Sequence, residues 1–179
     1  MVTVVEVQDA ARAAEIAELA ARTFPLACPP GTRREDIDLF VAEHLTERAF
    51  AGYVADPAAT VTCADDGGTA LGYSLLLHGT EPDGPERTSL RRRPTSLLSK
   101  FYVDPVRHGA GIATSLMTQT LAGAARAGSV AVWLGVNDQN SRAIRFYARA
   151  GFETVGTRSF TLGTDTHSDL VLERELTGR

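Results

Sequence analysis

Hydrophobic and polar positions at the start of the chain first follow a strand period and then a helix period. The segment "VTVVEV", residues 2–7, is short and rich in β-branched residues, which is typical of a strand. Asp9 then precedes an alanine-rich stretch with apolar residues at helical spacing. The expected apolar face consists of Ile16, Ala20 and Phe24. We expect this first helix to end at Pro25, because proline cannot continue it.

Two more helices are predicted before residue 57. In "TRRE", Thr32 and Glu35 have the spacing of a capping box, which predicts the start of the second helix. Its expected apolar face comprises Ile37, Phe40, Val41, His44 and Leu45. Thr46 is a candidate cap for a third, shorter helix that ends before Pro57.

The middle of the chain changes to a strand pattern. "ATVTC", residues 59–63, and "ALGYSLLL", residues 70–77, are strand-like runs, and the turn-forming "ADDGG" separates them. This arrangement predicts an antiparallel hairpin. Residues 79–94 are polar and include the charge run "RRR" at 91–93, so we interpret them as a loop.

A strand, a helix and a second strand follow in close succession. "SLLSKFYV", residues 96–103, predicts a strand, and the apolar periodicity from Ile112 to Gly128 predicts a helix. "VAVWLGV" is continuously apolar, as expected of a strand that is covered on both faces. A last helix over residues 141–150 precedes strands in "FETVG", "RSFTL" and "SDLVLEREL". The order indicates an α/β fold, a mixed sheet with a parallel strand-helix-strand unit at its centre.

Composition narrows the class of protein. A chain of 179 residues is long enough for one well-buried domain, so we expect a single domain over residues 1–179. A formal net charge of -4 favours neither nucleic acid nor anionic membranes as a partner. No signal-peptide pattern and no apolar run of spanning length is present, so we expect a cytoplasmic protein. The two cysteines, Cys28 and Cys63, have no metal-ligand spacing, and we predict no metal site.

The stretch "RHGAGIATSL", residues 107–116, lies where the predicted strand changes into the predicted helix. The start of a helix has free backbone N–H groups and a partial positive charge, so it stabilises an anion. Gly109 and Gly111 leave room for a phosphate, and Ala113 keeps the next turn small. Further donors come from Arg107, His108, Thr114 and Ser115. These features predict a phosphate site, although a tight turn without a ligand explains the glycines equally well.

Two other phosphate motifs fit this stretch less well. A Walker loop needs a lysine followed by serine or threonine after its last glycine, and none is present here. A dinucleotide-binding turn needs an acidic residue at the end of the next strand, whereas that strand ends in Gly135 and Val136.

A second motif, "WLGVNDQNSRAIRFYARAGF" at residues 133–152, makes the first one more specific. Asn140 and Tyr147 lie on one stripe of the predicted last helix, because Asn140, Ala143 and Tyr147 are three and four residues apart. With both motifs, the chain resembles the GCN5-related N-acetyltransferases (GNAT). "YVDPVRHGAGIATSLM" is similar to the family's pyrophosphate loop for acetyl-coenzyme A, and "VNDQNSRAIRFYARAGF" is similar to its second cofactor motif. "LSKFYV", "WLGV", "AIRFYARAGF" and "GTRSFTLGTDTHSDLVL" resemble more narrowly the polyamine acetyltransferase branch typified by PaiA.

The resemblance implies a GNAT fold, with a mostly antiparallel sheet, a parallel cofactor unit and flanking helices, and acetyl-coenzyme A as cosubstrate. It implies that main-chain groups at Tyr102 and Val103 bind the pantetheine arm and the thioester. The residues implied at the pyrophosphate are His108, Gly109, Ala110, Gly111, Ile112, Ala113 and Thr114. Asn140 would contact the cofactor, and Tyr147 would stand beside its sulfur as the catalytic hydrogen-bond donor.

The general base is not assigned by the resemblance. Relatives often place a glutamate on the strand before the pyrophosphate loop, but this chain has Leu97 at that position. Asp36, Asp38, His44 or an acidic residue of the 79–86 loop are the remaining candidates. His44, on an apolar helical stripe, is more typical of a buried core histidine than of a base.

Several of these residues also have a purely structural interpretation. Tyr147 could be a core tyrosine with a satisfied hydroxyl, and Asn140 could be only a helix cap. The arginines at 91–93 could reach the 3′-phosphate of coenzyme A or belong to a solvated loop. The polar residues Asp165, His167 and Asp169 could recognise a cationic acceptor or form a polar turn between two strands.

From motifs and resemblance together we expect an N-acetyltransferase that moves an acetyl group from acetyl-coenzyme A to a primary amine of a small molecule. A polyamine is one candidate acceptor. A protein or peptide N-acetyltransferase and an acyl-coenzyme A binding regulatory module with little catalysis are the alternatives. A homodimer is an expectation from the family only.

Overall fold

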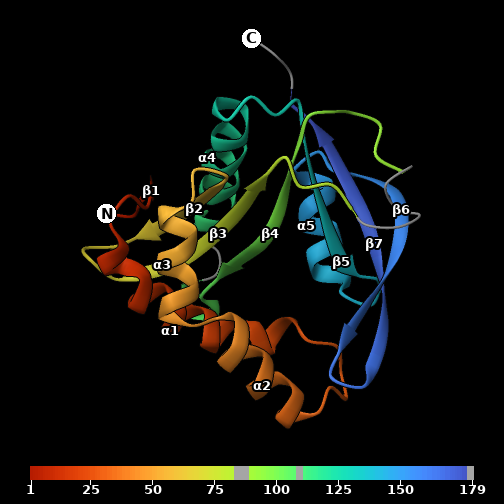
Figure 1. Cartoon of the computed structure of the whole chain (residues 1–179), viewed down its shortest axis with the longest axis horizontal. Coiled ribbons are helices and arrows are strands. Elements are labelled where there is room, and N and C mark those ends of the chain that lie inside the picture. The colour runs from red at the N-terminus through yellow and green to blue at the C-terminus, as the bar shows by residue number, and fades with distance from the viewer. Residues whose placement is uncertain (83–88, 108–110, 177–179) are drawn as a thin grey trace.

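The computed structural model describes residues 1–82, 89–107 and 111–176, and its strands form one seven-stranded sheet of order β1-β2-β3-β4-β5-β7-β6 (Figure 1). The strands are β1 (Thr3–Glu6), β2 (Ala59–Asp65), β3 (Ala70–His78), β4 (Thr95–Val103), β5 (Ala131–Asn137), β6 (Glu153–Leu162) and β7 (Asp165–Glu175). Neighbouring strands are antiparallel except for the parallel pair β4 and β5. This topology confirms the predicted α/β class, with a parallel strand-helix-strand unit inside a mostly antiparallel sheet.

The helices cover the two faces of the sheet. The α-helices of the described residues are α1 (Ala13–Thr23), α2 (Arg34–His44), α3 (Glu47–Ala55), α4 (Ile112–Arg126) and α5 (Ser141–Arg149). Consecutive residues of a strand point to opposite faces. Leu75 of β3 accordingly belongs to the core cluster that contains α1 and α3 side chains, and Leu76 belongs to the cluster beneath α4 and α5. Figure 1 shows the first group of helices in front of the sheet and α4 and α5 behind it.

Local sequence features explain where two of the helices begin. Thr46 precedes α3, and its hydroxyl accepts a hydrogen bond from the Ala49 N–H at 3.2 Å, as predicted. Asn140 caps α5 in the same way, because its side chain accepts from the Ala143 N–H at 3.1 Å. The helix α1 ends at Thr23, two residues before the proline that was expected to stop it.

The predicted capping box at the second helix is wrong. The helix α2 begins at Arg34, and its N-cap residue, Arg33, makes no side-chain cap. The hydroxyl of Thr32 instead donates to the Pro29 carbonyl oxygen at 2.7 Å. Because Thr32 closes a turn one residue too early, Glu35 falls at the second helical position and cannot complete the box.

The strand pattern at the end of the chain was predicted only in part. "FETVG" and "RSFTL" belong to one continuous strand, β6, with a register irregularity between Thr154 and Gly156. The turn to β7 is short, because Gly163 adopts a positive φ of 61°. His167 and Asp169 therefore lie within β7, and the interpretation of these residues as a polar turn is wrong.

The parallel strands β4 and β5 separate soon after they begin. The strand β4 pairs with β5 only at Thr95, Ser96 and Leu97, whereas its pairing with β3 continues to Val103. Ser99 of β4 has no opposite residue on β3 and forms a β-bulge. Figure 1 shows the two strands diverging beyond this point. The β5-side main-chain groups of β4 from Ser99 to Val103 therefore face a gap, which we call the β4–β5 gap.

The β6–β7 hairpin extends across the sheet to the N-terminal helices. Leu162, at the end of β6, packs in the core cluster of α1 to α3. The carboxylate of Asp36 on α2 lies against Gly163, where an added Cβ would overlap it. Figure 1 shows α2 beside the tip of this hairpin. The helix α2 and the hairpin therefore close one end of the face on which α1 and α3 lie.

Candidate functional site

The start of α4 has the properties predicted for an anion site. Gly111 is the N-cap residue with a φ of 72°, and among the described residues other than its chain neighbours no atom lies within 4 Å of the place where a Cβ would be. The first turn of α4 carries no acidic residue, and no side chain caps it. Its backbone N–H groups and the positive end of the helix dipole are therefore not neutralised by a side chain of the cap.

The predicted phosphate residues differ in their surroundings. Ile112 is buried and packs with Val103 at the end of β4, so the start of α4 and the β4–β5 gap are held together. Ala113 is partly buried, and Thr114 is exposed. His108, Gly109 and Ala110 lie outside the described residues.

Tyr102 and Val103 lie on the part of β4 that borders the β4–β5 gap. Their main chains pair with β3 on one edge only, opposite Tyr73 and Gly72. The ring of Tyr102 stacks on that of Tyr73 with centroids 5.6 Å apart, which anchors the strand. The other edge of the strand leaves its N–H and C=O groups open toward the gap.

Tyr147 packs against β4 on the face of the sheet opposite to the ring of Tyr102. Its ring is set in an aromatic cluster, with centroid distances of 6.3 Å to Phe101, 5.5 Å to Phe146 and 5.6 Å to Phe152. Burial raises the pKa of the Tyr147 phenol well above its usual value near 10, and the nearby Tyr102 phenol raises it further. Tyr147 therefore keeps its proton at neutral pH.

Asn140 has the capping role that its sequence position allowed. Its side-chain oxygen is used by the Ala143 N–H, and the side chain is only partly buried. The carboxamide still has N–H donors to offer, so capping and binding are compatible at this residue.

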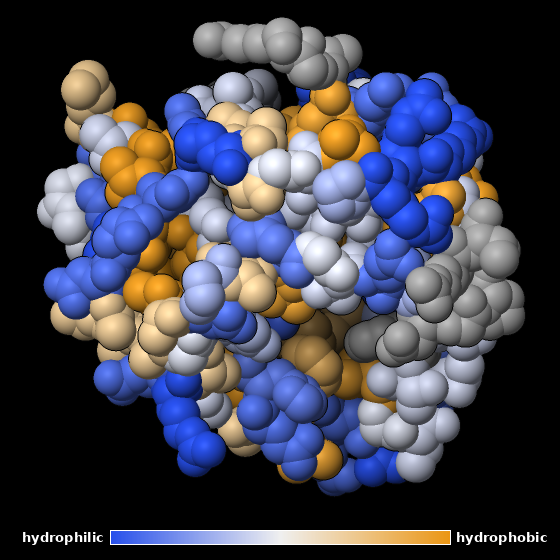
Figure 2. All heavy atoms as spheres, turned by 45° about the horizontal axis from the view of Figure 1, so that its top comes forward, coloured by the Kyte–Doolittle hydropathy of each residue, from blue (hydrophilic) through white to orange (hydrophobic). Residues whose placement is uncertain are grey.

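Figure 2 shows a hollow near the centre of the view, and the residues at its bottom are hydrophobic. The molecule therefore offers an apolar recess in which a ligand can be shielded from water.

The candidates for a general base differ in burial and in their ion pairs. Leu97 packs with Leu90 and Trp133 in an apolar cluster, so no carboxylate stands at its position. Asp38 is exposed and pairs with Arg34 at 2.8 Å. The side chain of His44 is 55% exposed, and the expectation of a core histidine is wrong, because α2 ends there at the surface. Asp36, in contrast, is buried.

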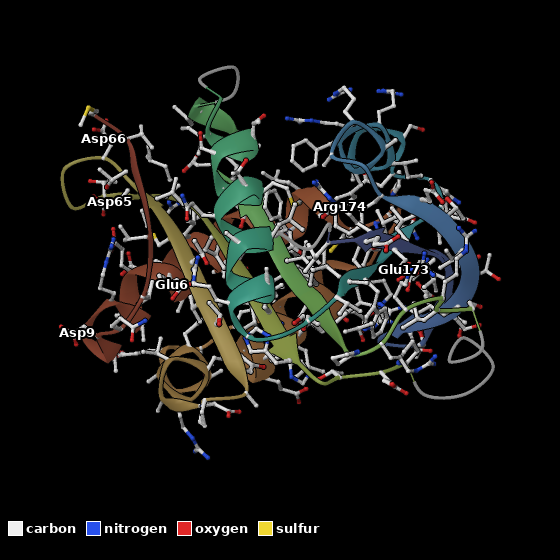
Figure 3. All side chains as sticks on the ribbon, turned by 90° about the horizontal axis from the view of Figure 1, so that it is seen from above. Glu6, Asp9, Asp65, Asp66, Glu173 and Arg174 are labelled. Carbon is white, nitrogen blue, oxygen red and sulfur yellow. The ribbon has the colours of Figure 1, made fainter. Side chains whose placement is uncertain are left out.

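The arginines at 91–93 are fastened to acidic residues. Arg91 pairs with Glu153 at 2.9 Å, Arg92 with Glu175 at 3.0 Å, and Arg93 with Glu81 at 2.7 Å. The buried carboxylate of Glu173 also accepts from the backbone N–H groups of Arg91 and Arg92. These contacts favour a structural role for the three arginines. A pocket of about 210 Å³ lies beside them, and its lining includes Arg91, Arg92 and the acidic residues of β6 and β7 to which they bind. Figure 3 shows that Glu173 on β7, which binds these arginines, lies at the opposite end of the sheet from Glu6 on β1.

Neither cysteine is an activated nucleophile. Both thiols are free, and burial raises the pKa of Cys28 and of Cys63 to about 11. At neutral pH each remains a protonated thiol, which is a poor nucleophile.

Two basic residues near the gap were not singled out from the sequence. Lys100, the only lysine of the chain, lies two residues before Tyr102 on β4. Its ammonium stands 5.9 Å from the ring centroid of Tyr53, and burial lowers its pKa. Arg158 of β6 pairs with Asp169 of β7, whose carboxyl pKa is raised by burial. Strand alternation could have placed Lys100 beside Tyr102, but the pairing of Arg158 depends on strand register.

Two features of the described residues concern other classes of site. Across the parts of the chain that the structure describes, no helix is both long and apolar enough to cross a lipid bilayer. Within the same residues, no group of three or more His, Cys, Asp or Glu side chains is arranged to hold a metal ion.

Comparison with known proteins identifies the family. The sequence profile of the Acetyltransferase (GNAT) family matches residues 13–152. An uncharacterized N-acetyltransferase of Mycobacterium tuberculosis is 44% identical over 162 residues, which cover 90% of this chain and 96% of that protein. The chain therefore belongs to the GNAT acetyltransferase family.

Solved structures show the same fold at low sequence identity. The PaiA N-acetyltransferase from Thermoplasma acidophilum, determined with coenzyme A, has a TM-score of 0.77 at 16% identity, covering 98% of this chain and 99% of that one. YncA from Salmonella typhimurium, determined with acetyl-coenzyme A, has a TM-score of 0.66 at 20% identity, covering 100% and 96%. These similarities confirm the GNAT fold expected from the sequence.

Proposed function

We propose that this GNAT acetyltransferase moves an acetyl group from acetyl-coenzyme A to a primary amine of a small molecule. The observation that carries the proposal is the β4–β5 gap. Beyond Leu97, the main chain of β4 has no partner on the β5 side, and the uncapped start of α4 adjoins it through the contact of Val103 with Ile112.

The residues present fit coenzyme A. A diphosphate needs backbone donors and no obstructing side chain, and Gly111 together with the first turn of α4 supplies both. A pantetheine arm contains amide groups that can pair with an open strand edge, and Tyr102 and Val103 provide such an edge. When bound, acetyl-coenzyme A supplies the acetyl group as a thioester.

The groups around the gap are suited to acyl transfer. A backbone N–H of the open β4 edge can stabilise the negative charge that develops on the acetyl oxygen, which is often the largest contribution in acyl transfer. The proposed role of Tyr147 is to donate a hydrogen bond to the sulfur. Since a phenol is normally less acidic than a thiol by about 1.5 pKa units, and burial raises the Tyr147 pKa further, Tyr147 donates a hydrogen bond rather than transferring its proton.

The acceptor must reach the gap as a neutral amine. An alkylamine with a pKa near 10.4 is neutral in only roughly one molecule in 10³ at pH 7, so loss of its proton limits the reaction. The apolar surroundings of Leu97 exclude a carboxylate base at that position of β4. The resemblance to the PaiA branch makes polyamines the first acceptors to examine, together with other small amines.

Two measurements test this proposal together. Titration calorimetry with coenzyme A should give a dissociation constant in the micromolar range, and acetyl-coenzyme A should release thiol when amines are added. No heat with the folded protein would contradict the proposal at its first step. Binding without thiol release would indicate a regulatory module, and release with peptides but with no free amine would indicate a protein N-acetyltransferase.

A further inference from the structure

Three buried polar atoms without a hydrogen bond to the described residues lie on α2 and the β6–β7 hairpin. Among the described residues, five buried side-chain atoms lack a partner, and three of them are Asp36 Oδ2, Arg158 Nε and His167 Nε2. An unmet buried donor or acceptor costs roughly 1–3 kcal/mol, so such atoms are rare unless something else satisfies them. Asp36 lies on α2, and the other two lie on the β6–β7 hairpin that reaches α2.

These atoms belong to one face of the sheet. Asp169 and Val171 of β7 point to the face of Trp133, because Val171 packs with Trp133 and Asp169 contacts Arg158 above that ring. His167 is two residues before Asp169 in the same strand, so it points to this face as well. Asp36 is 8% exposed and packs against the hairpin turn at Gly163, with Arg33 Nε 3.5 Å from its unpartnered oxygen.

Arg158 is held in a defined place next to the β4–β5 gap. Its guanidinium carbon is 5.7 Å from the ring centroid of Trp133, which is the last β5 residue paired with β4. The same guanidinium lies flat against Gly135, where an added Cβ would overlap it. The arginine therefore stands where the two strands begin to separate.

The ion pair with Asp169 does not use this guanidinium fully. The contact joins one nitrogen of Arg158 to one oxygen of Asp169 at 3.4 Å, whereas charge-assisted N–H···O pairs normally measure about 2.7–2.9 Å and are often bidentate with arginine. A guanidinium that is fixed by Trp133 and Gly135 and only loosely paired retains donors for a second anion.

We propose that the acceptor is a small zwitterion, a primary amine that also carries a carboxylate, and that Arg158 binds this carboxylate. The inference rests on the proposed acetyl transfer. The unmet donor of Arg158 calls for an anion, and the proposed acetyl transfer requires an amine, so one ligand with both groups fits both requirements. A diamine or polyamine would offer the remaining donors of Arg158 no anion and would place a second cation near them.

The first experiment uses the wild-type enzyme and pairs of acceptors that differ by one carboxylate. Thiol release from acetyl-coenzyme A is measured with lysine and cadaverine, ornithine and putrescine, and phenylalanine and phenethylamine. We expect the amino acid of at least one pair to have a kcat/KM at least tenfold above that of its decarboxylated partner. Equal or better turnover of the decarboxylated amine in every pair that reacts would overturn the inference and leave the proposed acetyl transfer intact.

The second experiment removes the arginine fork and keeps its charge. In Arg158→Lys, KM for the amino acid should rise about tenfold, while kcat, the affinity for coenzyme A and KM for the decarboxylated amine should change little. Gly135→Ala should have the same effect, because the added Cβ displaces the guanidinium without changing its charge. A parallel change of KM for both members of a pair would show a structural role for Arg158 and contradict the inference.

Arg12 offers a matched control. Its side chain is 27% exposed, the same fraction as that of Arg158, and it pairs with Asp65 at 2.6 Å. Figure 3 shows Asp65 at the end of the sheet away from Glu173 on β7. Arg12→Lys should leave the preference between amino acid and amine unchanged. Should Arg158→Lys fail to fold by circular dichroism, the wild-type acceptor pairs decide the question alone.

Discussion

The two sides of the β4–β5 gap are built from different chemical groups. The proposed cofactor side comprises the start of α4, the open edge of β4 and the α5 residues Asn140 and Tyr147, and main-chain groups make up most of it. The proposed acceptor side comprises α2 and the inner face of the β6–β7 hairpin, where buried charged side chains dominate. Main-chain groups recognise a ligand irrespective of nearby substitutions, whereas side chains can be exchanged one at a time. The first side is therefore suited to a cosubstrate shared by a family, and the second to an acceptor particular to this protein.

The largest effect that would test the cofactor side concerns turnover. Tyr147→Phe removes only the hydroxyl and leaves the aromatic cluster with Phe101 and Phe152 in place. We expect kcat to fall about 10²-fold, the scale of a single proton-donating group, with a change of less than about threefold in the dissociation constant of coenzyme A. Steady-state kinetics and calorimetry measure both quantities.

Tyr73→Phe is the control for that substitution, because the Tyr73 hydroxyl is buried and makes no hydrogen bond with the described residues. Its kcat should stay within about twofold of wild type, as expected for removing an unpartnered group. The pH profile adds a second check. Burial raises the Tyr147 pKa above 10, so ionisation of this phenol should not lower kcat at any pH up to 10. Turnover in Tyr147→Phe equal to wild type would remove Tyr147 from the mechanism.

A smaller effect is expected on binding when the start of α4 is changed. Gly111→Ala forces alanine into a positive φ and adds a methyl group at the proposed phosphate position, so the dissociation constant of coenzyme A should rise about tenfold or more. Gly128 has a similar φ of 85° just after α4 and equally free space around it. Gly128→Ala should reduce stability comparably without weakening coenzyme A binding, and equal calorimetric titrations for the two variants would refute the anion site.

A third comparison separates capping from binding at Asn140. Asn140→Ala and Thr46→Ala each remove one N-cap hydrogen bond, so each should lower the free energy of unfolding by about 1 kcal/mol in urea titrations. Only Asn140→Ala should also weaken coenzyme A binding, by about threefold, the effect of one modest hydrogen bond. If neither variant alters that affinity, Asn140 is a cap and nothing more.

The smallest effect concerns the charge of Lys100, and its sign follows from the pKa. Burial lowers the folded-state pKa of Lys100, so the ammonium destabilises the fold at pH 7 and this cost shrinks as the pH rises through that pKa. Lys100→Met should therefore be more stable than wild type at pH 7, by about 1 kcal/mol, and the advantage should decrease toward pH 10. Urea unfolding at both pH values measures this difference.

The exposed Arg48 on α3 supplies the control for Lys100, since an arginine does not lose its proton between pH 7 and 10. The stability of Arg48→Met relative to wild type should not vary over that range. A pH-independent difference for Lys100→Met as well would mean that the ammonium is as well solvated in the folded chain as in the unfolded chain.

The sequence predicted local features well where one short segment contained all the information. Thr46 caps α3, the β2–β3 hairpin forms around its glycine turn, and the strand-helix-strand unit at residues 95–137 is parallel. The prediction failed at Thr32, whose hydroxyl bonds to a turn, and at His44, which lies at the surface. Both residues lie at an end of α2. Where a helix begins or ends depends on contacts with residues distant in sequence as well as on the spacing of local residues.

By itself the sequence determined which elements form, and it indicated the family through two motifs whose residues act close to one another along the chain. Only the tertiary structure decided that β4 leaves β5 after Leu97, that Asp36 meets the hairpin at Gly163, and that Arg158 lies on Trp133 and Gly135. The physical reason is separation along the chain. Helical periodicity, caps and turns depend on residues a few positions apart. Packing and strand register instead bring Arg158 to Trp133 and Gly135, more than 20 positions away, and Asp36 to Gly163, more than 100 positions away.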